Sequence, residues 1–137
     1  MVERLVIRKT VYMDPVPQPR PRIYPTARGM RASVPDRVTS AKDKIAYALW
    51  EEGEKFPPDA AIRADLMFYL KKPKKPKHIT ALPIGKPDWD NLGKLVSDAI
   101  ESVVYHNDSQ ITDARVRKRY GEPHRVEITL MIDEGQD

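Results

Sequence analysis

Residues 88–103 carry the pattern that most restricts how this chain of 137 residues can fold. Apolar side chains recur there at helical spacing, namely at Trp89, Leu92, Leu95, Val96, Ala99, Ile100 and Val103. A helix with one such apolar face gains most of its stability by packing that face against another apolar surface. The pattern therefore predicts a helix that begins near Asp88 and docks on a sheet, with Trp89 packed at the edge of the apolar face.

Four other segments have the residue pattern of strands. Residues 3–13 alternate imperfectly between apolar and polar side chains, and residues 60–71 are more continuously apolar. Residues 110–120 and 124–132 are joined through Gly121-Glu122-Pro123. These four segments predict strands. The core candidates of the last two strands are Ile111, Val116, Val126, Ile128 and Leu130.

A further helix is predicted between the first two strands. Thr39 or Ser40 can cap it, and Gly53 lies close to its expected end near Lys55. Ile45, Ala48 and Leu49 form its apolar stripe. The resulting order of elements is typical of an α+β protein, and we expect a small mixed four-stranded sheet with two main helices packed on it. The length favours a single domain over residues 1–137.

Proline dominates the segment between residues 14 and 35. Pro15, Pro17, Pro19 and Pro21 favour an extended backbone, because each also pushes the preceding residue out of the helical region. A loop of this length is uncommon in a compact domain unless it has a function. Its arginines make contact with nucleic acid the expected function.

The composition excludes several classes of protein. No apolar run approaches the roughly 20 residues that cross a bilayer, and the N-terminus lacks the apolar region of a signal peptide, so we expect a cytoplasmic protein. The absence of cysteine excludes disulfides, thiolate chemistry and cysteine-based zinc sites.

The basic residues are clustered along the chain. The formal net charge is +4, and groups of Lys and Arg attract phosphate backbones regardless of base sequence. The clusters lie at Arg20, Arg22, Arg28, Arg31 and Arg37, at Lys71, Lys72, Lys74, Lys75 and Lys77, and at Arg115, Arg117, Lys118 and Arg119. We expect the first two clusters, without Arg37, to bind DNA. The alternative is that these charges only solvate surface loops and faces.

Acidic residues mark the start of the predicted helix. Asp88 and Asp90 each have an ordinary explanation as a cap and a first-turn acid, and Lys94 can form an i,i+4 ion pair with Asp90. Helical spacing places Asp90, Lys94 and Glu101 together on the face opposite the core. Mg²⁺ prefers carboxylate and phosphate oxygens. With Asp108 beyond the helix, these residues predict a metal site that would act on a phosphodiester.

Two segments carry the most specific pattern of the chain. The first is Lys86-Pro-Asp-Trp-Asp-Asn-Leu-Gly-Lys-Leu-Val-Ser-Asp-Ala-Ile, and the second is Tyr105-His-Asn-Asp-Ser-Gln-Ile. Both resemble the signature of the RusA family of Holliday junction resolvases. Pro17-Gln-Pro-Arg-Pro-Arg is similar to the opening loop of that family. The resemblance covers most of the chain, and residues 88–110 are its specific part.

The resemblance implies a small α+β endonuclease that acts in DNA recombination and repair. It implies a symmetric homodimer that cuts four-way DNA junctions with Mg²⁺ or Mn²⁺. Members of the family occur in bacteria, phages and prophages. By the same resemblance, Asp88, Asp90 and Asp108 are the essential metal-binding aspartates and Lys94 is the catalytic lysine. A dimer also follows from the reaction, because two symmetric nicks require two active sites in a matched orientation.

The chain departs from the family at two positions beside these residues. Trp89 stands where an aliphatic residue is usual, and Asn107 replaces an acid that often precedes the last aspartate. Neither change touches a matched catalytic position, so we expect an active enzyme.

Other residues that could carry chemistry have weaker patterns. His78, His106 and His124 are too scattered to predict a zinc site, and Ser109 lacks the His-Asp partners of a nucleophile. Asp98 is interpreted as a solvated acid. Tyr47 and Trp50 are expected in the core or in a dimer contact rather than as base-stacking platforms.

Two other functions remain open from the sequence. One is a junction- or duplex-binding protein without cleavage, which the intact set of three aspartates and a lysine disfavours. The other is a metal nuclease that acts on flaps or other branched DNA.

Overall fold

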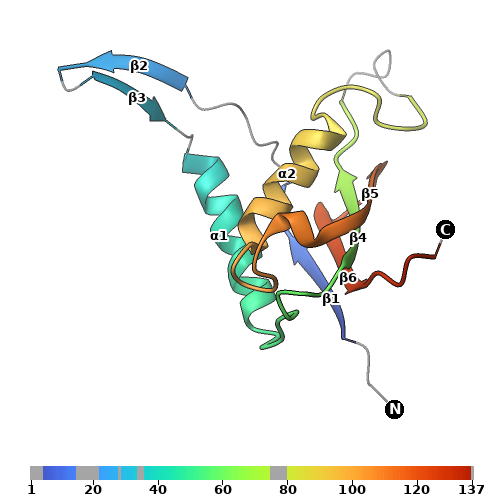
Figure 1. Cartoon of the computed structure of the whole chain (residues 1–137). Coiled ribbons are helices and arrows are strands. Elements are labelled where there is room, and N and C mark those ends of the chain that lie inside the picture. The colour runs from blue at the N-terminus through green and yellow to red at the C-terminus, as the bar shows by residue number, and fades with distance from the viewer. Residues whose placement is uncertain (1–4, 15–21, 28, 34–35, 75–79, 137) are drawn as a thin grey trace.

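The computed structural model describes residues 5–14, 22–27, 29–33, 36–74 and 80–136 (Figure 1), and of residues 22–26 and 30–33 it describes only the backbone. The strands are β1 (Val6–Tyr12), β2 (Arg22–Thr26), β3 (Gly29–Ser33), β4 (Ile62–Leu70), β5 (Ile111–Tyr120) and β6 (Arg125–Ile132). The helices are α1 (Asp36–Trp50), α2 (Trp89–Ile100) and the short 3₁₀ helix η2 (Asp108–Gln110).

Four strands form one mixed sheet in the order β1-β6-β4-β5. β6 runs antiparallel to both β1 and β4, whereas β4 and β5 are parallel. Parallel neighbours need a crossover connection, and α2 supplies it between β4 and β5. The expected α+β fold with a mixed four-stranded sheet and two main helices is confirmed. β5 and β6 follow each other in sequence, but β4 lies between them.

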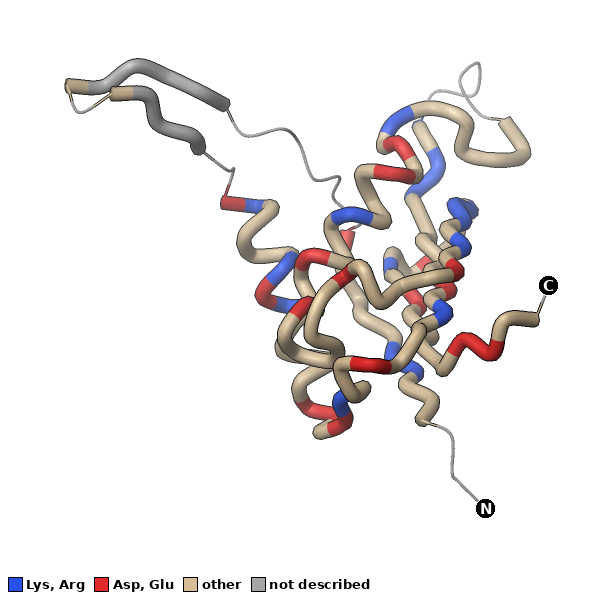
Figure 2. The backbone as a smooth tube through the Cα atoms, viewed as in Figure 1, with Lys and Arg blue, Asp and Glu red and all other residues tan. Residues whose placement is uncertain are grey.

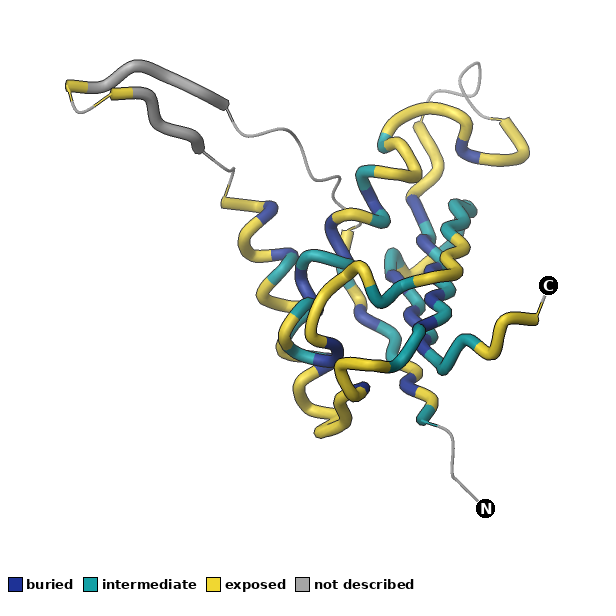
Figure 3. Tube along the Cα trace, in the orientation of Figure 1, coloured by how far each residue is buried: buried dark blue, intermediate teal, exposed yellow. Residues whose placement is uncertain are grey.

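Both helices cover one face of this sheet. α1 lies beside α2, with α1 against β1 and α2 against β5 (Figure 1). β4 alternates strictly, and its buried side chains point toward the helices. Most other buried residues of this core come from α1, α2, β1 and β6 (Figure 3), namely Val38, Ala41, Ile45, Leu49, Leu92, Leu95, Val96, Ala99, Ile100, Ile7, Val11, Val126, Ile128 and Leu130. Phe56, Val104 and Tyr105 join the core from connecting segments. Each large side chain buried in this way contributes roughly 1.5–3 kcal/mol, which exceeds the 0–1 kcal/mol typical of an exposed ion pair.

The core candidates of the last two strands are confirmed in most positions. Val126, Ile128 and Leu130 are buried, while Ile111 and Val116 are partly buried and pack against the core. Tyr47 and Trp50 are 61% and 66% exposed, and their ring centroids lie 5.8 Å apart. Of the two positions predicted for these residues, a place in the core is wrong, because both are largely exposed, and a dimer contact stays a prediction.

The opposite face of the sheet is polar. Arg117 donates two hydrogen bonds to Asp65, Arg63 pairs with Asp113, and the Arg125 guanidinium lies 3.8 Å above the Tyr69 ring. Arg117, a member of the third basic cluster, is therefore held by an acid of the neighbouring strand.

The first helix is longer at its start than the sequence predicted and shorter at its end. It begins at Asp36, and the buried Val38 and Ala41 extend its apolar stripe toward the N-terminus. It ends at Trp50 rather than near Lys55, because the chain turns at Gly53, which adopts a positive φ of 69°.

Part of the proline-rich segment forms a hairpin. β2 and β3 pair antiparallel from Arg22↔Ser33 to Thr26↔Gly29, and Gly29 has a φ of 107° beside the turn. The expectation of an irregular loop throughout residues 14–35 was therefore wrong for these ten residues. Each strand of a two-stranded ribbon has an unpaired edge, where proline such as Pro25 is tolerated. Pro15, Pro17, Pro19 and Pro21 lie outside the described residues. Figure 1 shows the hairpin extending away from the sheet beyond the start of α1.

None of the described helices is long and apolar enough to span a bilayer.

Candidate functional site

The start of α2 is exposed, and the loop that precedes it is anchored to β5. Asp88 occupies the N-cap position but makes no capping hydrogen bond with its side chain, and one of its carboxylate oxygens lies 3.7 Å from Lys86 Nζ. Lys118 Nζ donates hydrogen bonds to the carbonyl oxygens of Gly85 and Pro87, at 2.8 and 2.9 Å. The sequence placed Lys118 in a basic cluster. In the structure its hydrogen bonds attach the loop that leads into α2 to β5.

α2 approaches β5 closely at the glycine of the motif. A Cβ atom added at Gly93 would lie 3.2 Å from Cγ2 of Val116, which is tighter than ordinary van der Waals contact. The absence of a side chain at Gly93 therefore lets the acid-bearing helix lie close to the edge strand that follows Asp108.

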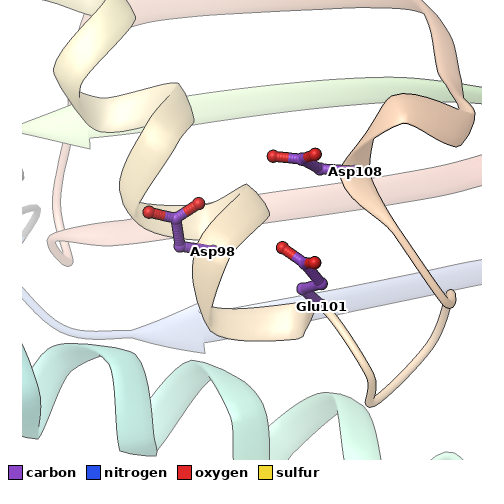
Figure 4. A group of neighbouring side chains, drawn as sticks. All are labelled: Asp98, Glu101 and Asp108. Atoms are coloured by element: carbon purple, nitrogen blue, oxygen red, sulfur yellow. The ribbon is translucent and has the colours of Figure 1, made fainter.

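Three carboxylates meet at the other end of α2. Asp98, Glu101 and Asp108 each offer an oxygen, and these oxygens all lie within 4.8 Å of one another (Figure 4). Asp98 belongs to the last turn of α2, Glu101 is its C-cap, and Asp108 begins η2. Asp98 and Glu101 are partly buried, whereas Asp108 is exposed. We call these three residues the acidic triad.

Asp108 is held in place by the residues on both sides of it. Asn107 caps η2 by accepting a hydrogen bond from the backbone N–H of Ser109 at 2.8 Å. Oε1 of Gln110 accepts from the backbone N–H groups of His106 and Asn107, and its Nε2 donates to the carbonyls of Pro57 and Ala60. The Asn-Asp-Ser-Gln segment therefore forms a reciprocally capped turn that is tied to the loop before β4.

A buried tyrosine lies beneath the triad. Tyr105 is fully buried, and its hydroxyl donates a hydrogen bond to the carbonyl of Ser97 in α2. Burial raises the pKa of Tyr105 well above its usual value of 10.0, and the negative charges of Asp108, Glu101 and Asp98 raise the pKa further. The tight turn between Glu101 and Tyr105 includes Ser102 in the left-handed region, at φ 69°.

Lys94 faces the triad rather than Asp90. Its Nζ lies 3.7 Å from an Asp98 oxygen, and its side chain is 60% exposed. Among the described residues Asp90 forms no ion pair, so the expected pairing of Asp90 with Lys94 is absent. The interpretation of Asp98 as a solvated acid was wrong, because Asp98 is partly buried, lies near Lys94 and belongs to the triad.

The acids of the site thus fall into two groups at opposite ends of α2. Asp90 precedes Asp98 by eight residues, a rise of about 12 Å along the helix. Figure 2 shows acidic residues near both ends of α2 with a basic residue between them. Within this one chain, the described structure brings Asp108 together with Asp98 and Glu101, but not with Asp88 and Asp90. The spacing of Lys94, Asp98 and Glu101, at i, i+4 and i+7, is the sequence signal that could have identified the triad.

The predicted DNA-binding residues are only partly described. Lys71, Lys72 and Lys74 are exposed at the end of β4. Arg22 and Arg31 lie in the hairpin, where only the backbone is described. Arg20, Arg28, Lys75, Lys77 and His78 lie outside the described residues. Among the described residues no histidine takes part in a metal-ligating group, and His124 contacts Asp14.

A cavity of about 340 Å³ lies beside the loop that precedes α2. Lys71 and Lys86 line it together with Ile84, Pro87 and Tyr120. Both cationic and apolar side chains therefore meet next to the first acidic group.

The sequence comparisons agree with the resemblance. The profile of the family described as "Endodeoxyribonuclease RusA" matches residues 13–131. The chain is also 32% identical over 134 residues to an uncharacterized protein, YqaN, of Bacillus subtilis strain 168, with 90% of this chain and 94% of that protein covered. The family match spans most of the chain, including both acidic groups and Lys94. The chain belongs to the RusA endodeoxyribonuclease family.

Proposed function

We propose that this protein is a divalent-metal-dependent endonuclease that resolves four-way DNA junctions by paired nicks. Membership of an endodeoxyribonuclease family gives the class of reaction. The observation that carries the proposal is the acidic triad, whose member Asp108 is held by a capped turn with Lys94 nearby. Recombination and repair are the processes that such an activity would serve.

The donors of the site fit Mg²⁺ or Mn²⁺. The three triad residues each offer a carboxylate oxygen, and these oxygens lie within 4.8 Å of one another. Asp88 and Asp90 offer carboxylates as well, and hard divalent cations select such oxygens. Crowded carboxylates repel one another unless a positive charge relieves them, and Lys94 Nζ lies 3.7 Å from an oxygen of Asp98. A bound Mg²⁺ would polarise the phosphodiester and acidify a water molecule.

By the family resemblance we assign the metal to Asp88, Asp90 and Asp108, which requires the two acidic groups to meet in the active enzyme. Asp98 and Glu101 are then neighbours of the ligand Asp108 rather than ligands themselves. We propose that Lys94 offsets negative charge that develops on the phosphate, which its exposed ammonium and its position along α2 between the two acidic groups support. Gln110 and Asn107 act as positioning residues for Asp108, since their hydrogen bonds fix the turn that carries it.

The chain is proposed to act as a symmetric homodimer. A four-way junction of roughly two-fold symmetry needs two active sites in a matched orientation. In a dimer, an acidic group of one protomer could meet the other acidic group of its partner. Within one chain, α2 separates the two groups by about 12 Å.

The direct test is cleavage of synthetic four-way junctions. In Mg²⁺ the purified protein should nick two opposite strands symmetrically, and a chelator should stop the reaction. A linear duplex of the same sequence and a flap substrate serve as controls. Junction binding without cleavage in Mg²⁺ or Mn²⁺ would support a non-catalytic binding protein, and equal cleavage of flaps would support a general branch nuclease.

A further inference from the structure

Trp89 does not take the position that its sequence pattern predicts. Its side chain is 61% exposed, although it belongs to the helical repeat that buries Leu92, Leu95, Val96 and Ala99. The reason is its place at the first residue of α2. Helical Cα–Cβ bonds tilt toward the N-terminus, so the indole projects past the start of the helix.

The segment before Trp89 exposes two more large apolar side chains. Ile84 is 81% exposed and Leu82 is 50% exposed. A single exposed apolar residue needs no explanation, but three within residues 82–89 make this segment a candidate contact surface. We call Leu82, Ile84 and Trp89 the apolar edge of the α2 loop. The hydrogen bonds from Lys118 to Gly85 and Pro87 anchor this loop to the sheet.

Lysines lie beside part of the apolar edge, at Ile84, whereas Asp88 and Asp90 flank Trp89 itself. The Lys86 side chain is 88% exposed, and Lys86 and Lys71 line the 340 Å³ cavity that also includes Ile84. Lysine is depleted in protein–protein interfaces. Exposed aromatic rings between cationic side chains are instead typical of surfaces that bind unpaired nucleotides, where rings stack on bases and cations contact phosphates.

We propose that Trp89 stacks on a nucleobase whose face is exposed at the branch point of the DNA. This inference rests on the proposed function and adds a residue that selects branched DNA over duplex. Bases inside a continuous duplex are stacked on both faces and offer no surface to an indole. At an opened branch point the terminal pairs have lost a neighbour, and Trp89 replaces it. The flanking Asp88 and Asp90 then lie beside the backbone of the same nucleotide.

The two tryptophans of the chain allow the contact to be observed directly. Trp50→Phe leaves Trp89 as the sole indole, and Trp89→Phe leaves Trp50, which is similarly exposed on α1. In the presence of chelator, a four-way junction should quench the emission of Trp89 much more than a duplex of matched sequence. The emission of Trp50 should respond equally to both DNAs. Equal responses of Trp89 to junction and duplex would overturn the proposal.

Binding measurements give the second test. Trp89→Ala should weaken junction binding about 5- to 150-fold, the range found for loss of one base-stacking side chain, while duplex binding stays unchanged. Trp89→Phe should retain part of the affinity, and Trp50→Ala should retain all of it.

The remaining outcomes separate the stacking role from the proposed function. If the unaltered protein shows no preference for junctions, the proposed function fails and the stacking role fails with it. If that preference exists and Trp89→Ala keeps it, only the stacking role is wrong. If Trp89→Ala lowers the molecular mass in solution and weakens both DNAs equally, Trp89 is a subunit contact instead.

Discussion

The two ends of α2 carry acids in opposite kinds of surroundings. At the start, Asp88 and Asp90 are exposed, Asp88 makes no capping hydrogen bond with its side chain, and a largely exposed tryptophan separates them. At the end, Asp98 and Glu101 are partly buried beside Asp108, which a capped turn holds in place.

This difference indicates which part of the site is preformed. Residues held by packing and hydrogen bonds keep a fixed geometry before substrate arrives, as a catalytic constellation requires. At the start, Lys118 anchors the backbone of the preceding loop, but among the described residues no hydrogen bond holds the carboxylates of Asp88 and Asp90. We therefore expect the geometry of these two carboxylates to depend on the metal, the DNA or the partner subunit.

The largest expected effect is on cleavage when either group loses an acid. Asp108→Asn and Asp90→Asn should each reduce the rate of junction nicking more than about 100-fold, because loss of even an outer-shell partner of a metal costs 10–100-fold. Junction binding in chelator should persist. Single-turnover nicking in Mg²⁺ with parallel binding assays measures both, and wild-type cleavage by Asp90→Asn would remove the start of α2 from the site.

Mixing these two inactive proteins sharpens the comparison between the two ends. If each active site takes Asp90 from one protomer and Asp108 from the other, a mixed dimer retains one intact site and nicks one strand. If each site lies within one chain, the mixture stays inactive. Asp90→Asn mixed with Asp88→Asn is the control, because these two changes lie in the same acidic group.

The next largest effect is expected from loss of Gln110, which positions Asp108. Gln110→Ala removes the acceptor of two backbone N–H groups and the donor to two carbonyls. We expect a loss of about 1–3 kcal/mol in the free energy of unfolding and a 10- to 100-fold slower cleavage. Ser109→Ala is the matched control, since only the backbone of Ser109 takes part in the capped turn. Unchanged cleavage by Gln110→Ala would show that the turn does not position Asp108.

A smaller effect, dependent on pH, is expected at Tyr105. Tyr105→Phe leaves the Ser97 carbonyl without its hydrogen bond and should cost about 1 kcal/mol near neutral pH. Since the pKa of Tyr105 is raised in the folded state, its hydroxyl ionises first in the unfolded chain. Its contribution to stability is therefore complete below pH 10.0 and declines as the pH rises above that value.

Thermal unfolding measured across this pH range tests the sign of the Tyr105 effect. The stability difference between wild type and Tyr105→Phe should shrink above pH 10.0, because the variant has no hydroxyl to ionise at that position. A difference that grows with pH would contradict the raised pKa.

The smallest effect on stability is expected at the start of α2. Asp88→Asn removes only an exposed ion pair with Lys86, so the free energy of unfolding should change by less than about 0.5 kcal/mol. Chemical denaturation measures this change, and nicking by the same variant should nevertheless be lost. A large destabilisation would show that Asp88 supports the helix start despite its exposure.

Much of the fold could be predicted from local pattern. The helical repeat located the start of α2 to within a residue of Trp89, although the helix ends at Ile100 and the predicted face residue Val103 lies beyond it. The apolar character of residues 60–71 located β4, and most core residues of β6 were also predicted. The order of strands could not be predicted in this way. β6 lies between β1 and β4 because backbone pairing joins segments far apart in sequence, and apolar spacing contains no information about which partner a strand selects.

The candidate site, like the fold, could be predicted only in part from the sequence. The motif identified Asp88, Asp90, Lys94 and Asp108 as candidate residues, and their catalytic roles remain proposals. It did not identify Asp98 and Glu101 as neighbours of Asp108, because that proximity depends on the tight turn between Glu101 and Tyr105 that brings the chain back over the end of α2.

The sequence by itself determined the family, the two main helices and the identity of the residues with suitable chemistry, since these depend on residue type and local spacing. The tertiary structure alone decided which acids meet, where Lys94 points and that Trp89 is exposed. Those properties depend on where each helix ends relative to the sheet and on how distant segments pack, and local spacing cannot encode either one.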